Sequence, residues 1–147
     1  MRGARSWRLG ADRSLSLDPW CLMGVLNATP DSFSDGGDHL DPAAAIASGL
    51  AMIEAGAAVI DVGGESTRPG AASVSTDEQI ARVVPVIEGV RRHPSGHSVA
   101  ITIDTTRAAV VEAAFDAGAD ALNDVSAGIE DPDVLRIVAE RDRGVVL

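Results

Sequence analysis

The sequence predicts an α/β protein, a partial (β/α)8 TIM barrel of about four βα units plus the start of strand five. Nearly continuous apolar runs alternate with amphipathic segments from Cys21 onward, a pattern typical of a parallel sheet with helical cover. Polar residues stand at the C-terminal ends of successive predicted strands, at Asn27, Asp61, Asp104 and Asn123. Barrel sites are built from such ends, so we favour a barrel over an open doubly wound sheet. The open sheet would fit 147 residues as a complete domain, whereas a barrel needs about 250.

Composition limits both the core and the partners of the chain. Hydrophobic residues make up 46% of it, with two Phe, two Trp and no Tyr, so the core must consist of Ala, Val, Ile and Leu. All 12 basic residues are Arg, and 22 acidic residues give a net charge of −10. The field of such a chain repels phosphates, which argues against nucleic acid as a partner.

Cysteine usage and hydropathy indicate the compartment. The single Cys21 has no partner for an internal disulfide, which fits a reducing environment. No apolar run approaches the roughly 18 residues of a membrane span, and no signal-peptide core follows the N-terminal Met. We therefore expect a soluble, cytoplasmic protein without a membrane partner.

Residues 1–20 are expected to form an N-terminal arm and a short hairpin ahead of a barrel domain at residues 21–147. Four arginines among the first 13 residues are compatible with a basic arm or a transit peptide. Leu15 and Leu17, however, alternate with polar residues in the period of a strand. We expect this strand to belong to a hairpin that closes the bottom of the fold, with a frayed terminus as the alternative.

The first half of the barrel domain contains two predicted strands and two predicted helices. A short buried strand covers Met23–Leu26, and Asp41 caps a helix that begins at Pro42 and ends at Gly56. A second strand follows at 57–62. Thr76 and Gln79 have the spacing of a capping box, and Pro85 should kink or split the helix that follows. The apolar faces of the two helices comprise Ile46, Leu50 and Ile53 in the first, and Ile80, Val83, Val84 and Ile87 in the second.

The second half repeats the same unit. Strands are expected at 99–104, 121–123 and from 144, with helices at 107–117 and after the acidic DPD sequence at 131–133. The sequences AGAAVIDVGG and AGADALNDVS form a weak internal repeat in which Asp61 corresponds to Asn123, 62 residues later. That distance equals two strand-and-helix units.

Three motifs lie at or after strand ends. They are MGVLNATPDSFSDGG (Met23–Gly37), DVGGESTRPG (Asp61–Gly70) and ITIDTTR (Ile101–Arg107), and the first two are glycine-containing loops of the kind that carry function on a rigid scaffold. Together the motifs closely resemble the pterin-binding family and, within it, the dihydropteroate synthases. The resemblance extends from about Leu22 to the last residue.

The resemblance implies a (β/α)8 barrel and a transferase of folate biosynthesis. Family enzymes condense 6-hydroxymethyl-7,8-dihydropterin pyrophosphate with 4-aminobenzoate, giving 7,8-dihydropteroate and pyrophosphate. The chain stops inside its fifth strand and has no Lys, so the Lys loop and the Arg-x-His pair of the family's second half have no counterpart. We therefore expect the N-terminal half of such an enzyme, an incomplete chain whose activity alone is in question.

The resemblance also implies roles for three strand-end residues. Asn27 matches the residue that contacts Mg²⁺ and pyrophosphate, and an amide oxygen is a suitable hard ligand. Asp104 and Asn123 match the pterin contacts, where a carboxylate and an amide suit the N–H donors of the pterin edge. The structural alternatives are a turn cap for Asn27, a helix cap for Asp104 and a turn at Asn123 beside Asp124.

Two loops are expected to complete the site. Phe33 and Pro69 would flank the benzene ring, Ser34 would approach its carboxylate, and Thr67 would contact the pterin substrate. The catalytic roles fall to Asp35, near the metal or the amine, and to Arg68, near pyrophosphate. A packed surface loop is the alternative for both segments. We expect Asp61, on its buried strand, to bond backbone amides rather than to act as a base.

Two other functions remain open at this point. A pterin-dependent methyltransferase shares the barrel and the Asp/Asn pair but lacks the TPDSFSDGG loop, and a non-catalytic pterin-binding remnant needs no second half. Family members dimerise commonly, so a homodimer is possible where the full barrel is present.

Overall fold

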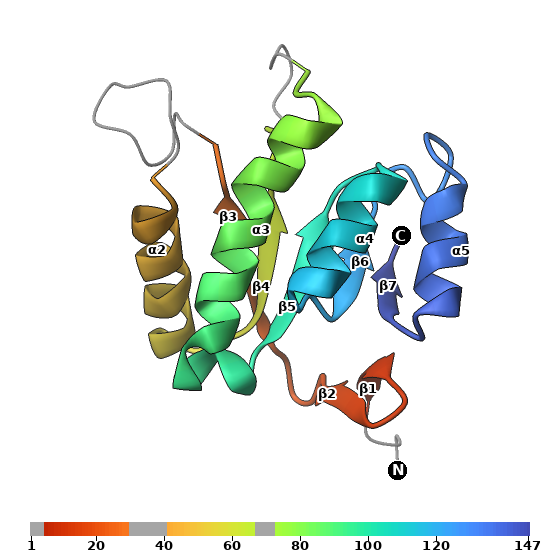
Figure 1. Cartoon of the computed structure of the whole chain (residues 1–147). Helices are drawn as coiled ribbons and strands as arrows, with labels where there is room; N and C mark the ends of the chain where they lie inside the picture. The colour runs from red at the N-terminus through yellow and green to blue at the C-terminus, as the bar shows by residue number, and fades with distance from the viewer. Residues whose placement is uncertain (1–4, 30–40, 67–72) are drawn as a thin grey trace.

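A curved sheet of five parallel strands forms the centre of the structure, a computed structural model that describes residues 5–29, 41–66 and 73–147. Each strand pairs with its neighbour in the sequence, in the order β3-β4-β5-β6-β7. Figure 1 shows the strands side by side with the helices in front of them. The strands are β3 (Leu22–Asn27), β4 (Ala57–Gly63), β5 (Ala100–Asp104), β6 (Ala121–Asn123) and β7 (Gly144–Val146).

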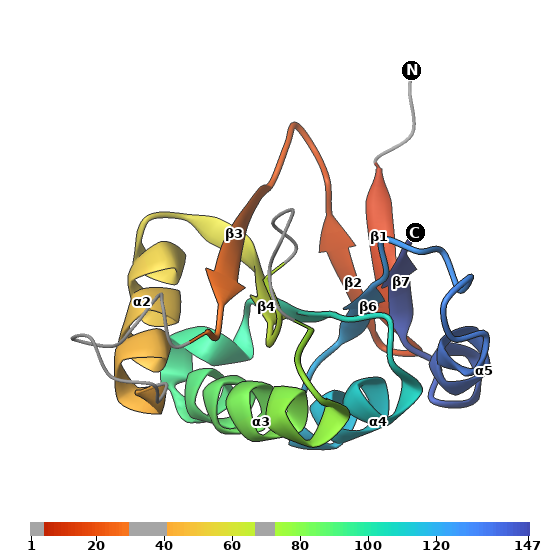
Figure 2. The same cartoon turned by 90° about the horizontal axis from the view of Figure 1, so that it is seen from above.

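The helices cover one face of this sheet. Figure 2, seen from above, shows them on the convex side of the arc of strands, while the N-terminal hairpin lies on the concave side. A doubly wound sheet reverses its strand order and carries helices on both faces, so sequential order with one-sided cover identifies part of a barrel wall. The predicted partial barrel is confirmed. The helices are α2 (Pro42–Glu54), α3 (Thr76–Arg92), α4 (Ala108–Ala117) and α5 (Asp133–Glu140), with a 3-10 turn, η1, at Pro94–His97.

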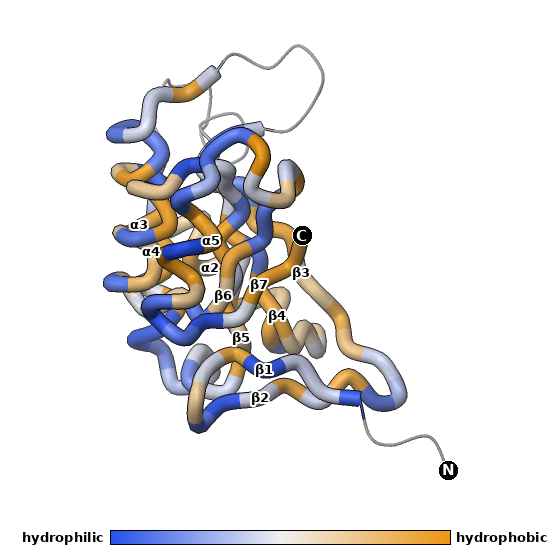
Figure 3. Tube along the Cα trace, turned by 90° about the vertical axis from the view of Figure 1, so that its right-hand side faces the viewer, coloured by the Kyte–Doolittle hydropathy of each residue, from blue (hydrophilic) through white to orange (hydrophobic). Residues whose placement is uncertain are grey.

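The outward-facing side chains of the sheet form the main core. Leu26, Val62, Ile103 and Leu122 lie in one register row and are fully buried. They pack against the inner faces of α3 and α4, and Figure 3 shows the apolar colour concentrated along the strands. This burial favours folding by roughly 1.5–3 kcal/mol for each large side chain. Within the described ranges, no helix is both long and apolar enough to cross a membrane.

A hairpin closes the lower part of the concave face, as expected. Strands β1 (Ser6–Gly10) and β2 (Arg13–Ser16) pair antiparallel. Leu9 is buried against Val59, Ala100 and Ala121, which point inward from the sheet. The upper part of the concave face therefore remains for the polar strand ends.

Several local expectations are wrong in detail. Strand β3 is not uniformly buried, because Val25 is 55% exposed on the open concave face of this edge strand. The side-chain cap of α3 is Ser75, which accepts from Glu78 N, so the predicted Thr76 and Gln79 capping box does not form. Helix α3 continues through Pro85, so the proline does not split it. Pro85 lies on the exposed side of the helix.

Helix α2 begins as expected but packs on smaller residues. Asp41 accepts a hydrogen bond of 2.9 Å from Ala43 N, and Pro42 is the first helical residue. The fully buried positions are Ala45 and Gly49, whereas the bulkier apolar residues flank them at the edge of the core. Gly49 matters because a Cβ there would stand 3.2 Å from side-chain atoms of β3 and α3.

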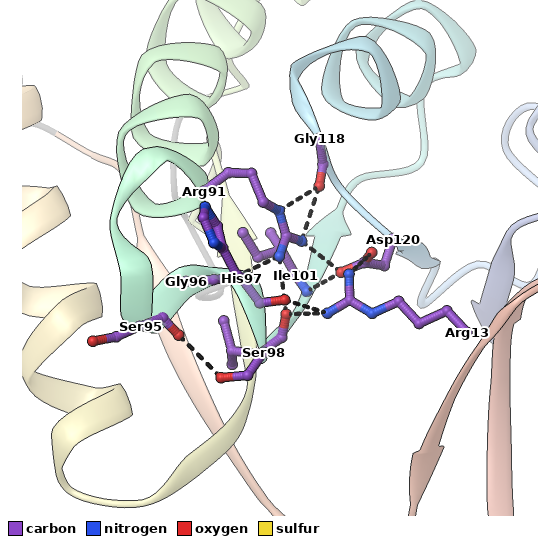
Figure 4. Close-up of polar contacts among 10 residues, drawn as sticks. Arg13, Arg91, Ser95, Gly96, His97, Ser98, Ile101, Gly118 and Asp120 are labelled. Atoms are coloured by element: carbon purple, nitrogen blue, oxygen red, sulfur yellow. Dashed lines mark hydrogen bonds and ion pairs between the residues drawn. The ribbon is translucent and has the colours of Figure 1, made fainter.

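A buried acid holds the hairpin to the amino ends of the strands (Figure 4). Asp120 is 4% exposed and accepts hydrogen bonds of 2.6 Å from both Arg13 and Arg91, and one of 2.8 Å from Ile101 N. Arg91 also donates to the carbonyl of Gly118. Two guanidinium groups on one buried carboxylate connect β2, α3 and the start of β6.

Removing this acid should cost much more stability than removing an exposed one. Asp120→Ala leaves two arginines and a backbone N–H without their acceptor, and we expect a loss of about 3 kcal/mol in the free energy of unfolding. The matched control is Asp116→Ala on helix α4, which breaks an exposed ion pair with Arg141 and should cost at most about 1 kcal/mol. Urea unfolding of both variants measures the difference, and equal losses would show that Asp120 is not a structural anchor.

Candidate functional site

The polar strand ends lie in a single row at the upper edge of the sheet. Asn27 pairs in register with Gly63, Gly63 with Asp104, Asp104 with Asn123, and Asn123 with Val146. Side chains alternate along a strand, and the positions one residue earlier face the helices, so this row faces the concave side. We call these five residues the carboxyl rim. The structure thus brings Asn27, Asp104 and Asn123 together, as the sequence predicts.

Gly63 leaves space between two of the predicted site residues. A Cβ placed on Gly63 would stand 3.7 Å from Asn27 Oδ1 and 3.7 Å from Asp104 Oδ2. Both oxygens therefore border the same position on the rim. Any side chain larger than a methyl group would occupy it.

The side chain of Asn27 is available for binding. It is exposed, and in the described part of the chain its amide makes no hydrogen bond. The backbone continues from β3 through a bond of 2.7 Å between Ala28 N and Gly63 O, which needs no side-chain cap. The turn-cap alternative for Asn27 is not what the structure shows.

Asp104 does not cap the helix that follows it. Thr105 Oγ1 accepts from Arg107 N at 3.2 Å, and Asp131 Oδ2 accepts from Ala108 N at 2.8 Å. Among the described residues, nothing donates a hydrogen bond to the Asp104 carboxylate. Burial, followed by the charges of Asp61 and Asp124, raises the pKa of Asp104 from 3.8 to about 6. An acid without partners whose pKa is raised at a strand end is a candidate for binding a donor.

Asn123 takes part in a polar network that the sequence interpretation missed. Its Nδ2 donates to Asp61 Oδ2 at 3.0 Å, and Thr102 Oγ1 donates to Asp61 Oδ1. Asp61 therefore bonds two side chains, not the backbone amides expected for it. The turn-forming role belongs to Asp124, which accepts from two backbone N–H groups in the loop after β6. The internal repeat that aligns Asp61 with Asn123 was the one sequence signal that could have indicated that these two residues lie close together.

An open cleft with a volume of about 180 Å³ lies beside Asp104. Its side wall is braced by Gln79, which donates to Glu65 Oε2 at 2.6 Å and accepts from Thr105 Oγ1 at 3.2 Å. Val125 is 71% exposed and adds an apolar surface next to the acid. A planar ligand with polar edges could form a hydrogen bond with Asp104 and an apolar contact with Val125 here. The lining residues are Glu65, Ser66, Gln79, Asp104, Thr105, Thr106, Val125 and Glu130.

The six loop residues predicted for the site lie outside the described residues. They are Phe33, Ser34, Asp35, Thr67, Arg68 and Pro69. Their roles stay predictions.

The raised pKa of Asp104 predicts a pH-dependent effect of Asp104→Asn. Between pH 3.8 and about 6 the folded protein holds a proton that the unfolded chain releases, so the cost of ionising Asp104 is complete above pH 6. Because the group is partly exposed, screening limits the gain at pH 7.5 to about 1 kcal/mol, or about 2–4 °C in Tm. Little gain should appear at pH 4. The control Asp12→Asn, exposed in the hairpin turn, should show no such difference, and a pH-independent effect of Asp104→Asn would contradict the assignment.

Comparisons with known proteins agree with this geometry. The sequence profile of the family described as pterin binding enzyme matches residues 23–147. Dihydropteroate synthase of Mycobacterium leprae is 48% identical over 126 residues, which cover 86% of this chain and 43% of that one. Dihydropteroate synthase of Xanthomonas albilineans, solved with 4-aminobenzoic acid, superposes with a TM-score of 0.85 at 44% identity, covering 98% of this chain and 51% of that one.

The chain therefore spans about half the length of these relatives. A second Xanthomonas albilineans structure, in complex with 7,8-dihydropteroate, aligns with a TM-score of 0.77 and 39% identity. The match over the strands and over the rim motifs leads to one conclusion: the chain belongs to the pterin binding enzyme family.

Proposed function

We propose that this chain supplies the N-terminal half of a dihydropteroate synthase site, condensing 6-hydroxymethyl-7,8-dihydropterin pyrophosphate with 4-aminobenzoate to give 7,8-dihydropteroate and pyrophosphate. One observation carries the proposal. Asp104, without a hydrogen-bond donor among the described residues, stands in the same rim row as Asn123 and Asn27. The similarity to synthases of two organisms supports it.

The chemistry of a pterin fits the acceptors of the rim. The pterin edge presents adjacent N–H donors in a guanidine-like arrangement, and the carboxylate of Asp104 can accept from them. Asn123 adds a neutral acceptor in the next strand. A carboxylate at this position also favours the positive charge that develops as pyrophosphate departs. Val125 would contact the ring face.

The charges at and beside the rim orient the substrate. Asp61, Asp104 and Asp124 lie on the β4 to β6 side, whereas Asn27 on β3 is neutral. A pyrophosphate group is repelled by the acids, so it would lie toward Asn27. We place the leaving group there, with Arg68 as the predicted nearby cation.

A Mg²⁺ ion fits the donor set of the rim only together with substrate oxygens. Among the described residues, no group of three or more His, Cys, Asp or Glu side chains could hold a metal ion. Mg²⁺ is typically bound by one or two protein ligands plus substrate phosphates, and the amide oxygen of Asn27 is a suitable single ligand. When bound, the ion would neutralise the charge of the leaving pyrophosphate.

The remaining roles follow the loops. Phe33, Ser34 and Pro69 would form the aminobenzoate site, Thr67 would contact the pterin substrate, and Asp35 would act near the metal or the amine. The cytoplasmic location and a homodimer of the full barrel are part of the same proposal. A pterin-dependent methyltransferase is the second candidate, favoured only by sharing the barrel and the Asp/Asn pair.

Restoring the second half of the barrel tests the proposal. The chain is expressed in a folate auxotroph alone and fused to the C-terminal half of the Mycobacterium leprae synthase. We expect growth only with the fusion, and release of pyrophosphate by the purified fusion from the two substrates, because the second half supplies the rest of the rim.

Substitutions in the fusion separate the site from the fold. Asn123→Ala should reduce kcat/KM at least tenfold by removing one substrate hydrogen bond, whereas Asp116→Ala on the outer surface of helix α4 should leave it within twofold. A folded fusion that binds pterin but releases no pyrophosphate would contradict the synthase reaction and favour the methyltransferase.

A further inference from the structure

Asp61 is a buried acid that the proposed reaction does not use. It is 3% exposed, and in the described part of the chain it forms no ion pair. Its two oxygens accept from Thr102 Oγ1 and from Asn123 Nδ2, at 3.0 Å for the amide. A buried carboxylate without a cation costs stability, and apolar residues of similar size often replace such groups without loss. The fold alone does not account for Asp61.

The hydrogen bond to Asp61 determines which way the amide of Asn123 points. Asn123 Nδ2 is the atom that donates to Asp61 Oδ2, so the nitrogen of the amide faces the carboxyl group. The oxygen, Asn123 Oδ1, is then turned away from Asp61. Asp61 lies two residues before Gly63 in β4, so it is one inward-facing position below the rim, and Oδ1 is directed to the rim side. The rim thus offers an acceptor at Asn123 beside the acceptor of Asp104.

We propose that Asp61 is a positioning residue that locks the carboxamide of Asn123 with its oxygen toward the ligand, so that the rim selects a ligand edge made only of N–H donors. The inference rests on the proposed function for the identity of that ligand, a pterin. The locked amide itself does not depend on it. Thr102 holds the other oxygen of Asp61 and so prevents the carboxylate from rotating.

The substitution Asp61→Leu tests the lock. Leucine has a similar size and offers no acceptor, so the nitrogen of Asn123 loses its partner and the amide turns that nitrogen toward the solvent-facing rim. A turned Asn123 presents Nδ2 to the ligand, and we expect pterin, followed by its own fluorescence, to bind about tenfold more weakly because one hydrogen bond is lost. Arg13→Ala, which weakens the amino-end anchor, should lower Tm without changing the affinity.

The double variant Asp61→Asn with Asn123→Asp reverses the polarity of the pair. The new amide donates to the new carboxylate, whose second oxygen faces the rim as an acceptor. We expect affinity within about threefold of the parent chain, whereas Asn123→Asp alone places two carboxylates side by side and should bind weakly. A purely structural role of Asp61 predicts no change in the affinity of folded Asp61→Leu.

A ligand-free measurement separates this inference from the proposed function. The chain has only three side-chain amides, those of Asn27, Gln79 and Asn123, so their NH₂ resonances are readily assigned by NMR. Exchange with solvent should be slow at Asn123 and at hydrogen-bonded Gln79, and fast at exposed Asn27.

The outcomes distinguish the two claims. Fast exchange at Asn123 in the parent chain, or unchanged exchange and affinity in Asp61→Leu, would overturn the positioning role, and the parent measurement stands even if the variant fails to fold. Slow exchange with no pterin binding by the parent chain or the fusion would support the locked amide while contradicting the proposed function.

Discussion

The register of the parallel sheet is the constraint on which the site depends. Because each strand pairs with the next without offset at its carboxyl end, residues far apart in the sequence meet in one row. That register is maintained from both sides. The fully buried row from Leu26 to Leu122 packs under the helices, and Asp120 with its two arginines holds the amino ends to the hairpin. A shift of one residue would turn the rim side chains into the helix layer.

The acids of the sheet have different hydrogen-bond partners because they lie at different positions. Asp120 accepts from arginines at the amino ends of the strands, Asp124 accepts from backbone N–H groups of a turn, and Asp61 accepts from the amide of Asn123. Asp104 is left with a free carboxylate, raised pKa and an open cleft beside it. In a chain with a net charge of −10, a single unpaired acid at a strand end is therefore informative, whereas the abundance of acids is not.

Much of the fold and the rim could be predicted from sequence because strand ends and helix caps are local signals. The polar residue that ends each apolar run identifies Asn27, Asp104 and Asn123, and Asp41 with Pro42 marks a helix start. Pairings between side chains are not local. The hydrogen bond between Asp61 and Asn123 depends on the register of the strands. Gln79 donates to Glu65 instead of capping its helix, which depends on how helix α3 is rotated about its own axis. Helix α3 accepts Pro85 because that position faces solvent, which the apolar spacing alone did not decide.

Asn27, Asp104 and Asn123 are expected to form one ligand-binding rim. The decisive measurement is a crystal structure of the chain fused to the second half of the Mycobacterium leprae synthase, with 6-hydroxymethylpterin bound. We expect the N–H edge of the ring on the Asp104 carboxylate and on Asn123 Oδ1, with the hydroxymethyl group at C6 directed toward Asn27. A ring bound instead between the hairpin and the lower sheet, or with its N–H edge away from both acceptors, would show that these residues do not form the binding site.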